Sequence, residues 1–254
     1  MRNYFELLGQ FISTDFKLRY KNSYLGILWI ILKPLASFAV IYIIWTNLFP
    51  QSPDFKMSLL LGIMIMNLFS ESIMMGMTSL STKAGIILKV RFPREVSVFS
   101  AVTISLFDFA INMIIFTAFA IWNPIDISFI GIILFILSIF SIYFITTGIS
   151  LFLSIMFIRL RDLNNLVSVV LQLFFWMTPV YYKIEMLPEN LQKIISLNPM
   201  THIVTLARRG LLGASNIATD DFWQIGIVFV LSLIVFGIGV LFFKKRVYKI
   251  AEYF

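Results

Sequence analysis

Six long apolar segments dominate the chain, at residues 26–49, 57–80, 96–122, 127–157, 163–181 and 222–243. A helix needs about 20 mostly apolar residues to cross the roughly 30 Å hydrocarbon core of a bilayer. Each segment reaches or approaches that length. We therefore predict an all-α, multi-pass membrane protein in which residues 1–254 form one transmembrane domain with six spans.

Basic residues lie almost entirely on one side of these segments. With six crossings both chain ends share a side, and that side carries fifteen of the twenty Lys and Arg residues. They are Arg2, Lys17, Arg19, Lys21, Lys33, Lys83, Lys89, Arg91, Arg94, Arg159, Arg161, Lys244, Lys245, Arg246 and Lys249. The other side carries Lys56, Lys183, Lys193, Arg208 and Arg209. Because basic residues near span ends stay in the cytoplasm, we predict cytoplasmic termini, with a tail at residues 244–254.

Composition agrees with a membrane protein and argues against several other classes. The chain is 59% hydrophobic and 13% charged, whereas soluble domains average about 45–50% and 25%. The net charge of +7 follows from the topology, so we expect membrane lipids and no nucleic acid as partners. There is no cysteine, no G-x-x-x-x-G-K-[ST] motif and no metal-ligand cluster, and His202 is the only histidine. We therefore expect no catalytic residue, metal or cofactor in this chain.

Residues 1–25 are too polar to span the membrane. Apolar residues recur near helical spacing at Phe5, Leu8, Ile12, Phe16 and Leu18. This pattern predicts an amphipathic helix at residues 4–20 that lies in the cytoplasmic interface. Two roles remain open for it: a simple membrane anchor, or a lever that responds to a cytoplasmic partner.

The first apolar segment contains Lys33 and Pro34 about two turns after its start. Proline removes a helix hydrogen bond and disfavours helix at the preceding residue, so we predict a bend here. The Lys33 side chain is long enough to reach the inner headgroups.

Two cytoplasmic loops follow the second and fourth spans. The loop at residues 81–95 is basic, yet its centre, at residues 85–88, is more apolar than a solvated connector needs. It suits either a short helix that docks into another protein or an interfacial turn against lipid. The second loop is a tight turn around Arg159, Arg161 and Asp162.

The external segment at residues 183–221 is long for a hairpin and too apolar for a solvated loop. It contains two helical pieces, at residues 188–196 and 200–212, separated by Asn198 and Pro199. Two half-length helices with a break predict a re-entrant hairpin that gates a pathway, and the alternative is a flat hairpin on the headgroups. A sixth span follows at residues 222–243. We expect His202 to be a hydrogen-bonded cap.

Two acids lie near the middle of spans. Glu71 is accompanied by Asn67 on its face of the second span, and Asp108 by Asn112 on the third. An ionised acid at mid-membrane is costly, so we expect each to face a partner or water. These faces either pack together through hydrogen bonds or form a proton relay.

Aromatic residues are densest before the external segment, at Phe174, Phe175, Trp176, Tyr181 and Tyr182. Their ring faces suit the apolar C–H faces of sugars, which would place them along a sugar pathway. An interfacial aromatic belt is the other interpretation.

Several motifs, in order along nearly the whole chain, resemble those of polysaccharide ABC exporter permeases. Residues 17–20, 23–26, Trp29 and 33–35 resemble the entry to the family's first span, residues 92–95 its first coupling loop, and residues 161–162 the turn before the fifth span. Residues 178–181, 187–188 and 197–200, with Arg208 or Arg209 and residues 212–213, resemble its outer segment. Each motif is weak alone, and the ordered set is fairly specific.

The resemblance implies a homodimer with two separate ATPase subunits that bind ATP and Mg²⁺. It implies that the substrate is a lipid-linked glycan on undecaprenyl pyrophosphate in the bacterial inner membrane, and we favour O-antigen over teichoic acid or capsule. It implies ATPase-coupling contacts at Lys83, Gly85, Ile86, Ile87, Leu88, Lys89, Arg91, Phe92, Arg94, Glu95, Arg159, Arg161 and Asp162. It implies an outer gate that includes Pro188, Asn198, Pro199, Arg208 and Arg209. Arg19, Lys21 and Lys33 suit either the substrate headgroup or anionic lipid.

Three classes of function therefore compete: a subunit of an ATP-driven glycolipid exporter, a proton-coupled secondary transporter that uses Glu71 and Asp108, and a polytopic membrane enzyme. The enzyme needs a cluster of acids or a metal site, and the sequence shows neither. The exporter needs an ATPase in trans, because this chain has no phosphate-binding loop.

Overall fold

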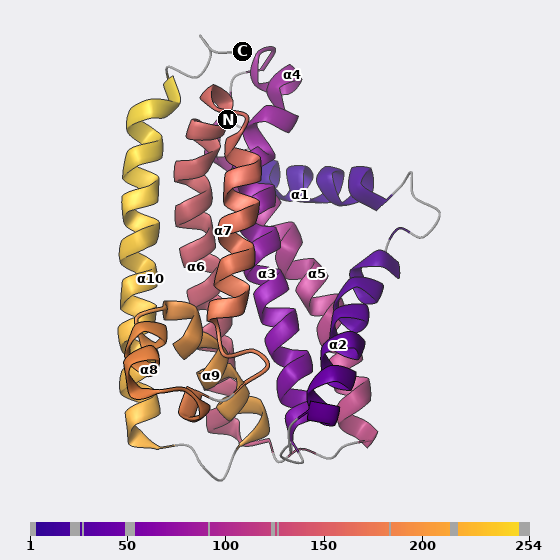
Figure 1. Ribbon diagram of the computed structural model, residues 1–254. Helices are drawn as coiled ribbons and strands as arrows, with labels where there is room; N and C mark the ends of the chain where they lie inside the picture. Colours follow the sequence, from indigo (N-terminus) through magenta and orange to yellow (C-terminus); the bar gives the residue numbers. More distant parts are fainter. Residues whose placement is uncertain are drawn as a thin grey trace.

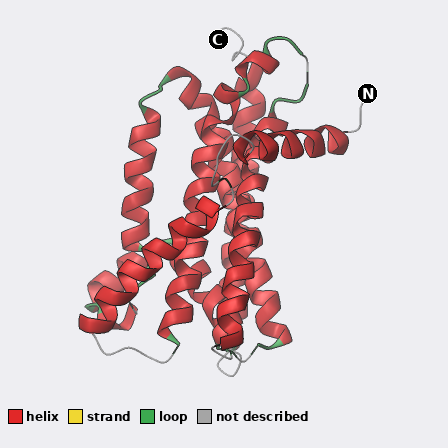
Figure 2. Ribbon diagram, turned by 90° about the vertical axis from the view of Figure 1, so that its right-hand side faces the viewer, coloured by secondary structure: helices red, strands yellow, loops and turns green. Residues whose placement is uncertain are grey.

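The computed structural model shows a bundle of helices, and no strand occurs among the described residues (Figures 1 and 2). The structure describes residues 4–20, 26, 28–48, 54–90, 92–122, 125, 127–182, 184–213 and 218–248. Its helices are α1 (Tyr4–Tyr20), α2 (Leu28–Leu48), α3 (Phe55–Thr82), α4 (Ala84–Ile87), α5 (Glu95–Trp122), α6 (Phe129–Arg159), α7 (Leu163–Met177), η1 (Ile184–Met186), α8 (Glu189–Ser196), α9 (Pro199–Leu212) and α10 (Thr219–Arg246). The all-α prediction is confirmed.

Five of these helices are long and apolar enough to cross a membrane: α2, α3, α5, α6 and α10. The fifth predicted span, at residues 163–181, is shorter than expected. Its helix, α7, ends at Met177 after 15 residues, which gives a length of about 22 Å at 1.5 Å per residue. The helix ends where Thr178 takes an extended conformation directly before Pro179, a position where proline disfavours the α-helical conformation.

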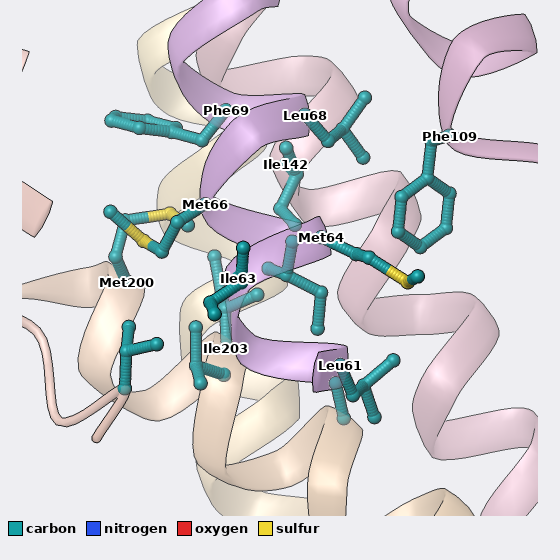
Figure 3. Close-up of a cluster of buried hydrophobic side chains, with 14 of the residues drawn as sticks. Leu61, Ile63, Met64, Met66, Leu68, Phe69, Phe109, Ile142, Met200 and Ile203 are labelled. Atoms are coloured by element: carbon teal, nitrogen blue, oxygen red, sulfur yellow. The ribbon is translucent and has the colours of Figure 1, made fainter. Parts of the chain in front are cut away.

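The hydrophobic core is centred on α3, which is the most buried of the five long helices. Figure 3 shows its side chains pointing in several directions, with Met64 towards Phe109 of α5 and Met66 towards Met200 of α9. The four residues named here are all buried. A helix that is apolar on most sides needs neighbours on most sides, which places α3 at the centre of the bundle; the exception is its face with Asn67 and Glu71.

Close packing of small residues joins α6 to its neighbours. A methyl group added to Gly148 would lie 2.6 Å from the carbonyl oxygen of Val235, so only glycine allows α10 to approach this closely. The buried hydroxyl groups of α6 mostly bond to carbonyls within the same helix, as Ser138 does to Leu134 at 2.8 Å. Small residues at helix contacts are typical of membrane bundles, where lipid offers no hydrophobic driving force for association.

Helix α1 lies across the bundle, roughly perpendicular to the long helices in both views (Figures 1 and 2). The predicted helix at residues 4–20 is confirmed, and Leu8, Ile12 and Phe16 are partly buried. Phe5 and Leu18 were expected on the same apolar face, but they are 81% and 68% exposed. Leu18 lies at another angular position around the helix than the three residues that face the bundle, whereas Phe5 shares their face but lies in the first turn of α1.

Helix α2 continues without interruption through Pro34, which is buried. Pro34 therefore does not end the helix, and the bend expected here stays a prediction.

The two ends of the bundle carry different elements. Helix α4 and the carboxyl end of α10 lie at one end, which we call the α4 end, and α8 and α9 lie at the other, the α9 end (Figure 1). At the α4 end, Arg94 donates a hydrogen bond of 2.5 Å to the carbonyl of Val247. At the α9 end, Arg209 forms an ion pair with Asp221.

Candidate functional site

A large cleft opens between the carboxyl end of α1 and helices α2, α3 and α5. Its volume is about 1120 Å³. Its polar lining includes Arg19, Tyr20, Lys33, Asn67, Glu71, Ser105, Asp108 and Asn112. The cleft thus brings together all four polar residues predicted inside the membrane and two of the three basic residues predicted to face a headgroup. Lys21, the third, lies outside the described residues.

The two intramembrane acids share one partner, Arg19 of α1. The Nη1 atom of Arg19 lies 2.8 Å from Asp108 Oδ2. Its Nη2 atom lies 3.7 Å from Glu71 Oε2. The Asp108 side chain is only 4% exposed, whereas that of Glu71 is 36% exposed. Arg19 therefore balances a buried carboxylate and stands close to a second, more accessible one.

The neighbouring Tyr20 strengthens this contact. Its hydroxyl donates a hydrogen bond of 2.6 Å to Asp108 Oδ1. Burial and the bond to Asp108 raise the pKa of Tyr20, so its hydroxyl stays protonated and remains a donor. Two adjacent residues of α1 thus hold one carboxylate of α5, and they fix the carboxyl end of α1 at the edge of the cleft.

Asn112 lies in the wall of the cleft, one turn beyond Asp108. Its Nδ2 atom donates to the carbonyl of Asp108 at 3.0 Å. Its Oδ1 atom is buried, and no hydrogen-bond partner for it occurs in the part of the chain that the structure describes. Buried amide oxygens are normally paired, so this one requires an explanation.

Comparison with known proteins agrees with a transport role for this cleft-bearing bundle. The sequence model of a family described as "ABC-2 type transporter" matches residues 6–212. The chain belongs to the ABC-2 type transporter family. It is therefore a multi-pass membrane permease subunit.

Three similar proteins are each named "O-antigen export system permease protein RfbA". One from Klebsiella pneumoniae is 31% identical over 252 residues, which cover 98% of this chain and 95% of that protein. A second from the same organism is 29% identical over 260 residues, with the same coverage of both chains. A third, from Myxococcus xanthus, is 27% identical over 206 residues, covering 78% of this chain and 77% of that one.

In this ABC-2 transporter, the residues predicted to contact an ATPase differ in accessibility. The short helix expected at residues 85–88 is present as α4, Ala84–Ile87. Ile86 and Leu88 are 49% and 55% exposed, whereas Ile87 is 6% exposed and belongs to the buried cluster that includes Leu80, Val98 and Phe243. Ile87 thus contacts the transporter's own core, and Ile86 and Leu88 form the outward surface.

The other residues predicted for coupling are distributed around α4. Gly85 and Lys89 are exposed. Phe92 is partly buried, with its ring 5.0 Å from that of Phe11. Arg94 binds the end of α10, and Glu95 begins α5. Arg91 lies outside the described residues, as do Arg2, Lys183 and Lys249. At the second predicted contact, Arg159, Arg161 and Asp162 are exposed between α6 and α7.

Lys83 connects α1 to the start of α4. Its Nζ atom lies 2.5 Å from Asp15 Oδ2 and donates to Ser100 Oγ at 2.6 Å. Burial lowers the pKa of Lys83, and the carboxylate of Asp15 opposes that shift. Lys83 is 9% exposed, so in this conformation it is a link between helices of the transporter.

The outer segment contains both predicted helical pieces, as α8 and α9. The break at Leu197–Asn198 is stabilised from both sides: the Asn198 side chain accepts a hydrogen bond from the Met200 amide at 2.9 Å and donates one to Thr178 Oγ1 at 3.1 Å. Pro199 begins α9 and Pro188 precedes α8. His202 contacts the Ser196 carbonyl at 2.7 Å, which agrees with a capping role.

Arg208 holds α9 to two other parts of the transporter. It donates hydrogen bonds to three backbone carbonyls: Ser58 at 2.9 Å, Pro179 at 2.7 Å and Val180 at 2.5 Å. These carbonyls belong to the start of α3 and to the turn after α7. Its neighbour Arg209 is more exposed and pairs with Asp221 of α10.

Four of the five predicted pathway aromatics form a chain of ring contacts at the end of α7. The rings of Trp176 and Tyr181 are 5.2 Å apart, and Tyr181 lies 5.1 Å from Trp45 of α2. Phe175 and Tyr182 join the same group, whereas Phe174 packs against Phe69 in the core. None of these five aromatic residues lines the cleft between α1, α2, α3 and α5.

Sequence reasoning missed Asp15, Tyr20 and Ser100. Asp15 and Tyr20 belong to α1, where the sequence suggests ordinary residues of an interfacial helix. Ser100 lies in an apolar span. The only signal available was that the acids of α3 and α5 needed a cation; nothing in the sequence singles out Arg19, which lies 52 positions from Glu71 and 89 from Asp108.

Proposed function

We propose that this chain is the transmembrane subunit of an ATP-driven exporter that moves a lipid-linked polysaccharide of the O-antigen class across the bacterial inner membrane. The observation that carries this proposal is the match to O-antigen export permeases along 98% of the chain. The substrate is then a glycan on a polyprenyl pyrophosphate, undecaprenyl pyrophosphate being the expected carrier.

ATP hydrolysis belongs to a separate subunit in this proposal. The sequence contains no phosphate-binding loop, so ATP and Mg²⁺ bind a partner ATPase. Two copies of this chain pair with two ATPase subunits. The α4 end faces the cytoplasm, as the distribution of basic residues favours. The short helix α7 then brings the number of crossings to six, with the outer segment beside it.

The exposed apolar residues of α4 support the docking of a partner at this end. Ile86 and Leu88 present side chains that a solvated loop does not need. Movement of α4 reaches α1 through the ion pair of Lys83 with Asp15. It reaches the cleft through Arg19 and its bond to Asp108. In this scheme α1 is a lever between the ATPase and the cleft.

The cleft suits the anionic headgroup of such a substrate. Arg19 and Lys33 both line it and come from different helices, α1 and α2. A pyrophosphate group offers oxygens that compete with the carboxylates of Asp108 and Glu71 for Arg19. Entry of the headgroup would thus release α1 from α5. The outer segment, with α8 and α9, is the gate on the opposite side.

No specific observation favours the proton-coupled alternative. Arg19 contacts both candidate relay acids, which gives Glu71 and Asp108 a partner without any role in proton transfer.

The proposal is tested by co-purification and export. The tagged chain, expressed in its own host, should retain an ABC ATPase through purification, and its deletion should remove long-chain O-antigen from the cell surface. Ile86→Asp should abolish the ATPase contact while the permease itself remains folded, because the charge enters an apolar docking surface. A chain that purifies without any ATPase, from cells with normal surface glycan after its deletion, would refute the proposal.

A further inference from the structure

The unpaired amide oxygen of Asn112 marks the wall of the cleft as a binding surface. Asn112 is 7% exposed and lines the cleft, and no described residue donates to its Oδ1 atom. A buried acceptor without a donor destabilises the protein unless a ligand supplies one. A hydroxyl group is a suitable donor, because it rotates to suit its acceptor and accepts a second bond itself.

The groups around Asn112 suit a ligand with several hydroxyls. Asn67 of α3 lines the same cleft and offers both donors and an acceptor. The carboxylate of Glu71, also in the lining, accepts hydrogen bonds and is accessible. A flat hydrocarbon would leave these groups without partners. A polyol satisfies them because each of its hydroxyls both donates and accepts.

The remaining wall is apolar, and most of it is aliphatic, with Ile30, Leu32 and Leu68 among its residues. It includes two aromatic residues: Trp29 of α2, which is about half exposed, and Phe109 of α5, which is only 6% exposed, so Trp29 offers the accessible ring. Ring faces pack against the apolar C–H faces of a sugar ring, while its hydroxyls point to the amides. The ligand class that uses both surfaces is a pyranose. Metal binding has no support, since no group of three His, Cys, Asp or Glu side chains converges anywhere in the described ranges.

We propose that this wall of the cleft is a subsite for the sugar unit attached directly to the phosphate of the substrate, with Asn112 and Asn67 reading its hydroxyls. The subsite rests on the proposed function, because it assumes that the substrate carries a glycosyl phosphate. The cleft volume of about 1120 Å³ exceeds the range of roughly 300–1,000 Å³ that holds most small ligands. A sugar and its phosphate therefore fit together, with the phosphate at Arg19 and Lys33.

Binding of soluble headgroup fragments tests the subsite. The permease–ATPase complex in nanodiscs is titrated with glucose 1-phosphate, N-acetylglucosamine 1-phosphate and inorganic phosphate. At least one sugar phosphate should bind ten or more times more tightly than inorganic phosphate. Equal affinities for all three probes would overturn the subsite.

Asn112→Leu should reduce the affinity for the preferred sugar phosphate to that of inorganic phosphate, while phosphate binding itself is retained. The matched control is Asn47→Leu. The Asn47 amide donates to the carbonyl four residues earlier, as that of Asn112 does, but Asn47 is exposed on α2 outside the cleft. Asn47→Leu should leave both affinities unchanged. An Asn112→Leu protein that keeps the sugar preference would overturn the assignment.

A second variant covers the case in which Asn112→Leu does not accumulate. Asn67 is partly exposed, and Asn67→Leu should weaken sugar phosphate binding by about threefold to tenfold without changing phosphate binding. An unchanged sugar preference in this variant also counts against the subsite. The export assay separates the sugar subsite from the proposed function. If surface glycan depends on the chain but the cleft shows no sugar preference, only the subsite is refuted.

Discussion

Arg19 and Arg208 are both cations that contact buried groups, but their partners differ. Arg19 meets carboxylates of two other helices, at the edge of a cleft. Arg208 meets three backbone carbonyls at the α9 end. Carboxylates and phosphates are interchangeable partners for a guanidinium group. Backbone carbonyls are fixed in their segments. We therefore assign an exchangeable contact to Arg19 and a permanent one to Arg208.

The largest effect is expected at Arg208. Arg208→Leu removes a hydrogen bond from three carbonyls, and each charge-assisted bond contributes about 1.5–3 kcal/mol, so we expect a loss of at least about 4.5 kcal/mol. The melting temperature of the purified protein should fall by at least about 9 °C. Protease cleavage within residues 184–213 should increase at the same time.

Arg209→Leu is the control for that change. Arg209 is 45% exposed, and its buried partner Asp221 keeps a hydrogen bond from the Ala218 amide, so we expect a loss of about 2 kcal/mol, well below that of Arg208→Leu. Equal losses in the two variants would show that Arg208 is not the permanent contact of the outer segment.

Arg19→Gln should have an intermediate effect on stability and a large effect on transport. The variant leaves Asp108 buried with Tyr20 as its remaining partner, and we expect a loss of about 2 kcal/mol, less than for a fully buried pair because Arg19 is 30% exposed. A double-mutant cycle with Asp108→Asn measures the coupling. Additive losses would show that the two side chains do not interact.

The comparison of Arg19 with Arg208 also shows which parts of the structure could be predicted from the sequence. The helices follow from apolar segments of fixed length, and the break at Asn198 and Pro199 is a local signal that the structure confirms. The partners of Arg19 and Arg208 come from residues 52 or more and 28 or more positions away, and no local pattern specifies them.

Ile87 and Lys83 also differ from their predictions because their contacts come from residues distant in the sequence. Ile87 looked equivalent to Ile86 and Leu88 because an apolar run carries no sign of which side faces the core. Lys83 was predicted to contact the ATPase, and its link to Asp15 was missed because Asp15 belongs to a helix whose docking position only tertiary structure defines.

Asn198→Ala tests the outer segment with a smaller change. It removes the cap of α9 and the bond to Thr178, and we expect a loss of about 1–2 kcal/mol. Chemical denaturation measures this value. No loss of stability would mean that the Asn198 side chain does not hold the break between α8 and α9.

The smallest effect is expected at Glu71. Glu71→Gln removes a charge that lies 3.7 Å from Arg19 and is 36% exposed, so the stability should change by less than 1 kcal/mol. Export should continue, because an amide still accepts hydrogen bonds in the cleft. A stable, well-expressed Glu71→Gln protein without export would instead favour a proton-coupled mechanism.

In the proposed mechanism α1 moves relative to α5 during transport and carries the action of the ATPase to the cleft. The rings of Phe16 in α1 and Phe107 in α5 lie 6.4 Å apart, and the chain has no native cysteine. Phe16→Cys with Phe107→Cys can therefore be joined by a reducible thiol cross-linker. ATP-dependent movement of lipid-linked glycan is then measured in proteoliposomes. We predict no movement in the cross-linked complex and recovery after reduction; full movement with the cross-link in place would contradict the lever.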